Sequence, residues 1–78
     1  MRLHYRSLTI PQGCHPLVRE LFEEMHAQRC GARDMADRSG VNVNTLKDWR
    51  TRTQPRIADL EACFNVLGYT LRPVERKS

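Results

Sequence analysis

The sequence predicts a single, mostly α domain of four short helices, with a short β-strand expected at each end. The chain has 78 residues, which suits one domain with a small core. Hydrophobic residues make up 40% of it and charged residues 28%, the composition of a globular protein rather than a disordered one. Apolar side chains recur at helical spacing through the middle of the chain and alternate with polar ones near its ends.

The N-terminal part predicts a strand followed by a helix. Residues 1–13 alternate loosely between apolar and polar side chains until a proline and a glycine interrupt them. Residues 16–29 have the pattern of an amphipathic helix, and Pro16 suits its first turn. Gly31 is expected to end that helix in a left-handed conformation. The apolar stripe at i, i+3, i+4 and i+7 consists of Val18, Leu21, Phe22 and Met25.

Two short helices joined by a tight turn are predicted next. Residues 33–39 form the first and residues 43–51 the second, with Gly40 as the turn because glycine tolerates a positive φ. Asn42 precedes the second helix, and asparagine is a preferred N-cap residue. The side chains expected to face inward here are Met35, Ala36, Val41, Leu46 and Trp49.

The last third predicts a fourth helix and a second strand. The helix follows a loop at residues 52–55 and is expected to stop at Gly68. Residues 69–74 alternate again and predict a strand, which Pro73 interrupts. A core this thin makes a homodimer a natural supplement, with the terminal strands as its candidate seam. The apolar stripe of the fourth helix consists of Ile57, Leu60, Phe64 and Leu67, with Cys63 beside it.

Charge is distributed unevenly along the chain. The formal net charge is +4, and residues 29–56 hold seven basic residues against three acids. Residues 15–28 hold one base against three acids. A basic balance permits a polyanionic partner. We expect a cytoplasmic protein without a membrane span, because no apolar run is long enough and the N-terminus lacks a signal-peptide pattern. Three cysteines without a CxxC pair fit reduced thiols.

The central stretch ARDMADRSGVNVNTLKDW has a set of residues at informative spacing. Ala36 is a small contact residue, Gly40 follows four positions later, and Leu46 and Trp49 anchor the second helix. This stretch resembles the helix-turn-helix of the lambda-repressor/Cro-like family, also called the xenobiotic-response-element family. The resemblance covers about residues 17–71, including RTRTQPRIADLEACFNVLGYTL. It implies a compact four-helix DNA-binding domain whose second and third helices form the helix-turn-helix.

The resemblance and the side-chain chemistry together predict the DNA contacts. An asparagine amide can bond adenine N6 and N7, and a lysine can donate to guanine O6 and N7, each with roughly 1–3 kcal/mol of discrimination. A valine can meet a thymine methyl group, and a carboxylate can accept from cytosine N4 or pair with an arginine such as Arg52. The predicted base-contacting residues are Val43, Asn44, Lys47 and Asp48. The predicted backbone-contacting residues are Arg33, Thr45, Arg50, Thr51, Arg52, Thr53 and Arg56.

The chain departs from the family pattern at two places. The family commonly has Thr-Gln or Ser-Gln where this chain has Gly31 and Ala32, so the phosphate contact of that glutamine is not expected. After the tryptophan, the family's Glu-x-Gly is replaced by Arg50, Thr51 and Arg52. The additional arginines are expected to compensate electrostatically.

The function expected from these residues is sequence-specific binding of double-stranded DNA. We expect a transcriptional regulator, a repressor of phage or prophage Cro type, acting as a homodimer on an inverted repeat. At this length we expect no separate sensor domain. The alternative is an antitoxin or another protein-interaction module of the same fold that binds a toxin or a regulatory protein. No catalytic set, cofactor motif or close pair of metal ligands is present, so neither an enzyme, a cofactor nor a metal site is expected.

Overall fold

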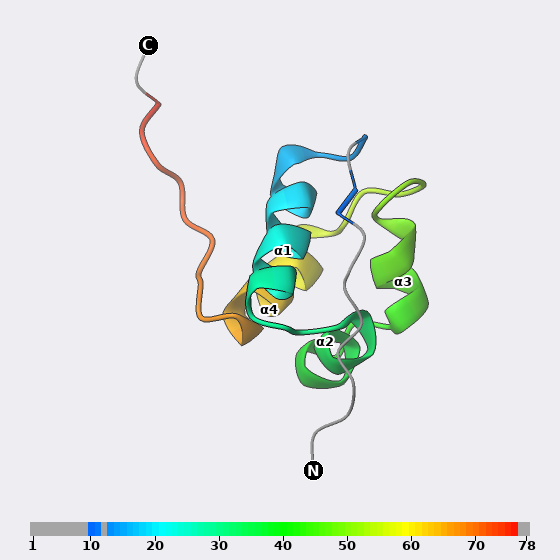
Figure 1. Ribbon diagram of the computed structural model, residues 1–78. Helices are drawn as coiled ribbons and strands as arrows, with labels where there is room; N and C mark the ends of the chain where they lie inside the picture. Colours follow the sequence, from blue (N-terminus) through cyan, green and yellow to red (C-terminus); the bar gives the residue numbers. More distant parts are fainter. Residues whose placement is uncertain (1–9, 12, 77–78) are drawn as a thin grey trace.

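The computed structural model describes residues 10–11 and 13–76 and shows a small all-α domain. Figure 1 shows α2 packed between α3 and α4, with α1 lying on α4. No strand occurs in the described residues, and the strand predicted near the N-terminus falls almost entirely outside them. None of the four helices combines the length and apolar character that crossing a membrane requires. The helices are α1 (Pro16–Ala27), α2 (Ala32–Ser39), α3 (Val43–Asp48) and α4 (Ile57–Val66).

The core confirms most of the predicted inward-facing residues. The complete stripe of α1 is buried, and Met35, Leu46 and Trp49 join it from α2 and α3. Burying this apolar surface is the main favourable term in folding. Cys30, between α1 and α2, is also in the core, although its position outside any stripe gave no sign of that. From α4 and the residue after it, the core receives Leu60, Cys63, Phe64 and Leu67.

The predicted stripe of α4 is wrong at its first residue. Ile57 is 79% exposed, whereas Leu60, one turn later, is 6% exposed. α4 begins at Ile57, because Arg56 is its extended N-cap residue. The side chain of a first helical residue lies over the end of the helix, and here it is left in solvent. The i, i+3 pattern therefore continues in the sequence beyond the point where a packing partner is present.

α1 ends two residues before the predicted position, and at a different left-handed residue. The amide of Arg29 donates to the carbonyl of His26 (3.1 Å), and the amide of Cys30 donates to that of Met25 (2.8 Å). These two bonds form a Schellman motif, in which the left-handed residue is Arg29 with φ 56°. Gly31 instead has φ −74° and is the N-cap residue of α2. The prediction for Gly31 is wrong because the buried Cys30 bonds back to α1, so the left-handed turn occurs at Arg29, two residues before Gly31.

Replacing Arg29 with glycine is expected to stabilise the protein relative to an alanine at the same position. Both variants lose the arginine side chain, but only alanine keeps the Cβ that disfavours a left-handed conformation. We expect Arg29→Gly to exceed Arg29→Ala by about 1 kcal/mol in the free energy of unfolding. Urea denaturation of the two variants measures the difference. Equal stabilities would show that the chain does not turn left-handed at this residue.

The other helix ends explain two further differences from the predictions. α3 ends at Asp48 rather than at residue 51, because the amides of the next loop bond to the Asp48 carbonyl. α4 stops as predicted with a left-handed Gly68 (φ 94°). Tyr69 follows, and its amide donates a hydrogen bond to the Phe64 carbonyl (2.9 Å). Its ring makes an edge-on contact with the Phe64 ring. Residues 70–76 are extended without a partner strand in the described chain, so the second predicted strand is not formed.

Candidate nucleic-acid interface

A glycine turn fixes how α3 follows α2. Gly40 has φ 84°, and its amide donates to the carbonyl of Ala36 (3.0 Å), which closes α2. The amide of Val41 donates to the Ser39 hydroxyl (3.1 Å), and the Val41 side chain is 7% exposed. In Figure 1, α3 runs upright while α2 lies below it in a different direction. The left-handed turn and the buried valine therefore set the direction in which α3 leaves.

The N-terminus of α3 is closed by its own cap, as predicted. The side-chain oxygen of Asn42 accepts a hydrogen bond from the amide of Asn44 (2.8 Å). Leu46 is completely buried and Trp49 is 3% exposed, so these two side chains hold the inner face of α3 on the core. The outer face of this short helix is consequently presented to solvent in one orientation.

The structure divides the predicted base-contacting residues into two groups. Asn44 and Lys47 are exposed, one helical turn apart on α3. Val43 and Asp48 are half-buried. In the described chain the only ion pairs are on α1 and α2, so the pairing considered between Asp48 and Arg52 is not formed. The most accessible hydrogen-bonding groups on α3 are therefore an amide and an ammonium group.

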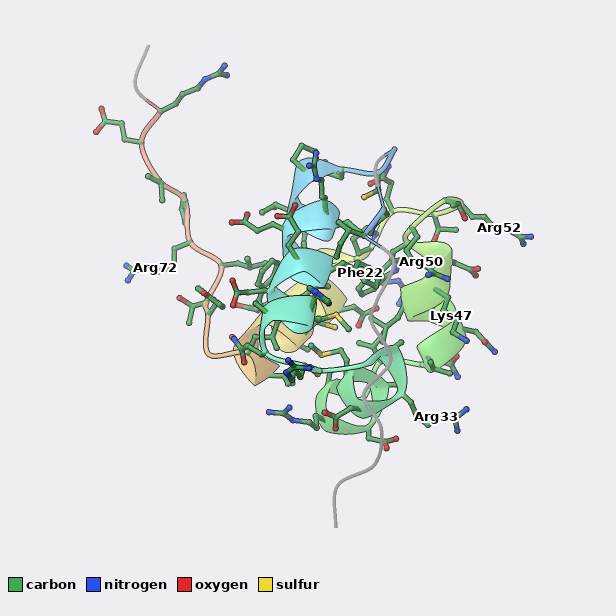
Figure 2. All side chains as sticks on the ribbon, in the orientation of Figure 1. Phe22, Arg33, Lys47, Arg50, Arg52 and Arg72 are labelled. Carbon is green, nitrogen blue, oxygen red and sulfur yellow. The ribbon has the colours of Figure 1, made fainter. Side chains whose placement is uncertain are left out.

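Basic side chains surround the outer face of α3. Figure 2 shows Arg33 of α2, Lys47 of α3 and Arg52 of the next loop extending from the body on the side where α3 lies. Arg50 is half-buried, and its Nε donates to the carbonyl of Lys47 (3.3 Å), so this guanidinium also closes the end of α3. Thr45 is half-buried as well. The remaining predicted backbone-contacting residues are exposed, namely Thr51, Arg52, Thr53 and Arg56.

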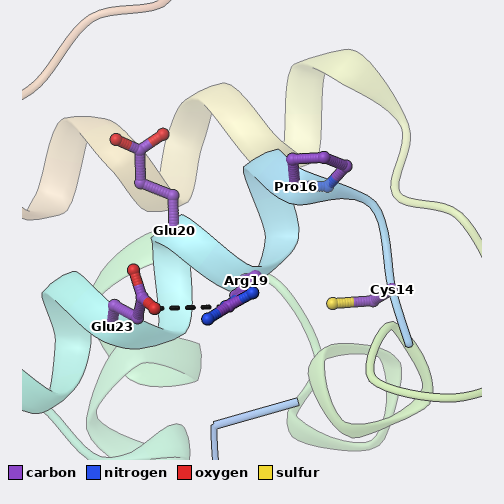
Figure 3. A pocket seen from close by; sticks show the side chains of 5 residues that line it. All are labelled: Cys14, Pro16, Arg19, Glu20 and Glu23. Atoms are coloured by element: carbon purple, nitrogen blue, oxygen red, sulfur yellow. Dashed lines mark hydrogen bonds and ion pairs between the residues drawn. The ribbon is translucent and has the colours of Figure 1, made fainter. Parts of the chain in front are cut away.

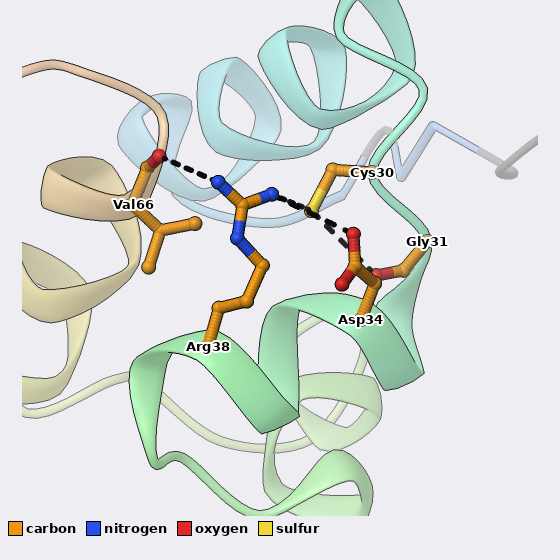
Figure 4. A network of polar contacts seen from close by, with 5 residues as sticks. All are labelled: Cys30, Gly31, Asp34, Arg38 and Val66. Atoms are coloured by element: carbon orange, nitrogen blue, oxygen red, sulfur yellow. Dashed lines mark hydrogen bonds and ion pairs between the residues drawn. The ribbon is translucent and has the colours of Figure 1, made fainter.

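Arg38 is basic but has a structural role. Its guanidinium donates to the carbonyl of Val66 at the end of α4 (3.3 Å) and pairs with Asp34 one turn earlier (3.5 Å), as Figure 4 shows. It also approaches the Cys30 sulfur (3.9 Å). Burial, followed by the nearby Asp34 carboxylate, raises the pKa of Cys30 to about 11, which keeps this thiol protonated at neutral pH. The network ties α2 to α4 and withdraws Arg38 from the surface that other arginines form.

The bonding partners of Arg38 and Arg50 were not evident from the sequence. In the sequence Arg38 was one of several basic residues without a predicted partner. Its hydrogen bond joins two helices across 28 positions, and such a bond leaves no local sequence pattern. Arg50 was predicted as a phosphate contact, and its bond within α3 depends on where that helix ends.

In the described residues, no three His, Cys, Asp or Glu side chains form a group that would hold a metal ion. No family model, curated protein or solved structure matches the chain.

Proposed function

We propose that this protein is a sequence-specific DNA-binding transcriptional regulator of the lambda-repressor/Cro-like type. In this proposal α2, the Gly40 turn and α3 form a helix-turn-helix, and α3 is the recognition helix in the major groove. The regulator is a repressor that acts as a homodimer on an inverted repeat, with its two recognition helices about 34 Å apart.

The observation that carries the proposal is the outer face of α3. Asn44 and Lys47 are exposed there, while Leu46 and Trp49 attach the opposite face of the same helix to the core. Side chains that read bases have to project from a rigid support, because a loosely held helix would lose the energy of each base contact to conformational freedom. The short length of α3 does not prevent this, since the N-terminal residues of a recognition helix make the base contacts.

The chemistry of the two exposed side chains suggests which bases they read. The Asn44 amide has one donor and one acceptor group, which match adenine N7 and N6 in the major groove. Lys47 donates only, which suits the two acceptors of guanine. Arg33 and Arg52, on the same side of the molecule, would contact phosphates on either side of the groove and set the register of α3.

Selection of bound sequences from a random duplex library tests the proposal. We expect enrichment of an inverted repeat whose half-sites contain the bases read by Asn44 and Lys47. Failure to enrich any motif would contradict DNA readout. It would favour the alternative in which the same fold is a protein-interaction module, such as an antitoxin, and α3 or another surface binds a protein.

Replacing Arg52 with alanine is expected to weaken binding to all DNA sequences by a similar factor. Arg52 is exposed beside α3, and an arginine that neutralises one phosphate releases about one counterion. The slope of log affinity against log salt concentration should therefore become flatter by about one unit. Asn65→Asp on the exposed side of α4 lowers the net charge by the same one unit away from α3, and as the matched control it should leave the slope unchanged. A loss of sequence preference in Arg52→Ala would instead place this side chain on a base.

A further inference from the structure

The extended C-terminal segment, residues 70–76, has bonding groups without partners. Its backbone amides and carbonyls form no hydrogen bonds within the described chain, and neither Arg72 nor Arg76 forms an ion pair there. Val74 is 87% exposed, so its side chain is accessible to a partner. Such a segment can pair with another surface through its backbone and through alternate side chains.

The edge of this segment that carries Arg72, Val74 and Arg76 is basic with an apolar centre. Successive side chains of a β-strand point to opposite sides, so these three residues would share one side of the segment when it pairs as a strand. The distance from Arg72 to Arg76 along the segment is about 13 Å, at 3.3 Å per residue. Glu75, the only acid among residues 70–76, would lie on the other side of such a strand.

α1 carries a surface with the opposite charge. The acidic face of α1 consists of Glu20, Glu23 and Glu24, and Leu17, 38% exposed, lies on the same side of the helix as Glu20. From Leu17 to Glu24 this face extends about 10 Å, at 1.5 Å per residue. It is therefore similar in length to the basic edge of residues 70–76, and it too combines charge with an exposed apolar side chain.

A pocket opens on this acidic face. It has a volume of about 450 Å³ and is lined by the two carboxylates Glu20 and Glu23 and the single guanidinium of Arg19, together with Cys14 and Pro16. Figure 3 shows that Arg19 pairs with Glu23 (3.2 Å), and Glu20 has no ion partner among the described residues. The pocket thus has an uncompensated negative charge and room for one more cationic side chain.

We propose that two copies of the chain associate by reciprocal exchange of residues 70–76. The basic edge of each segment lies along the acidic face of α1 in the other copy, with an arginine entering the pocket beside Glu20. The exchange is symmetric, so each copy contributes one segment and one acidic face, as in a closed two-fold dimer. It also buries Val74 and Leu17, and so adds apolar surface to a small core. This proposal does not depend on whether α3 binds DNA.

The occupant is a second copy rather than the same chain, because the segment begins in a fixed direction. Tyr69 is held by its amide bond to the Phe64 carbonyl and by the edge-on contact of its ring with Phe64. The charge of Glu24, followed by burial, raises the pKa of the Tyr69 hydroxyl, which places this ring beside the acidic face. Beyond Tyr69 the segment leaves its own α1 without any hydrogen bond or ion pair to it. Figure 1 shows it running away from the helices.

Two charge-reversed variants test this exchange in the absence of DNA. The first has Arg72→Glu and Arg76→Glu, which makes the segment acidic. The second has Glu20→Lys and Glu23→Lys, which makes the face of α1 basic. Each variant alone brings like charges together at both contacts, so its dimer dissociation constant should rise at least about tenfold. An equimolar mixture of the two restores opposite charges at both contacts of a heterodimer, and dimers should reappear.

Sedimentation velocity from micromolar to millimolar protein measures the fractions of monomer and dimer. Glu61→Lys on the exposed side of α4 is the control for a change in net charge. Recovery of dimers in the mixture alone supports the exchange. Dimerisation of the Glu20→Lys/Glu23→Lys variant at wild-type concentrations would overturn it, because pairing of two C-terminal segments does not involve α1. A wild-type protein that stays monomeric at millimolar concentration would overturn it as well. None of these results bears on DNA binding by α3, which the library selection tests separately.

Discussion

Alanine in place of Asn44 is expected to lower affinity for the selected DNA site by about 1–3 kcal/mol while leaving binding to unrelated DNA almost unchanged. The asparagine amide is exposed on the outer face of α3, where it would form two hydrogen bonds with one base. Lys47→Ala should have a similar effect at a different base position of the site. Binding titrations against the selected site and against each single-base variant of it measure both effects.

Loss of folding would not explain this result. The cap of α3 uses the backbone amide of residue 44, which an alanine retains, and alanine is a better helix former than asparagine. Asn65→Ala, on the exposed side of α4, is the matched control for removal of an asparagine side chain and should bind like the wild type. Unchanged preference at every base position in both Asn44→Ala and Lys47→Ala would refute α3 as the recognition helix.

The largest effect on stability is expected for Trp49→Ala, which should lower the free energy of unfolding by about 3–5 kcal/mol. Trp49 is 3% exposed at the end of α3, and an alanine there leaves a cavity that the surrounding core can fill only in part. Domains of this size are stabilised by only about 5–15 kcal/mol, so a large share of the protein would be unfolded at moderate temperature. Thermal and urea denaturation measure the change.

Ile57→Ala is the matched control, because it removes an equally apolar side chain from an exposed position. At 79% exposure, its loss should change stability by less than about 0.5 kcal/mol. The pair also separates two roles of the tryptophan. If Trp49→Ala remained as stable as the wild type but lost affinity for DNA, then the indole would stack on DNA instead of packing in the core.

The helices were predictable because their determinants are local. The buried stripe of α1 follows from apolar residues at a 3.6-residue period, and Asn42 and Gly40 identify the two ends of the turn before α3 through their own chemistry. The errors occur where a contact with residues distant in the sequence determines whether a side chain is buried. Whether Ile57 is buried depends on whether another part of the fold packs against the first turn of α4, and no pattern around residue 57 contains that information.

The exposed residues of the candidate site were predictable from the sequence, as the helices were. Exposure of Asn44 and Lys47 follows from the burial of Leu46 and Trp49, since residues on opposite faces of one helix are assigned together. The partners of the arginines were not predictable. Arg38 bonds to the carbonyl of Val66 on α4, 28 residues away, so this bond exists only once the helices are assembled. Arg50 bonds to the carbonyl of Lys47, three residues earlier, and this bond depends on where α3 ends.

The loop after α3 is ordered before any partner arrives. The amides of Thr51, Arg52 and Thr53 all approach the single carbonyl of Asp48, at 3.1, 2.7 and 3.1 Å. Three successive residues are therefore immobilised by one acceptor at the end of the helix. The conformational entropy of this loop is lost during folding, so binding of DNA as proposed would not have to include that loss. The backbone of Arg52 is thus held in place, so under the proposed function a longer or looser loop should weaken DNA binding even with every cationic side chain retained.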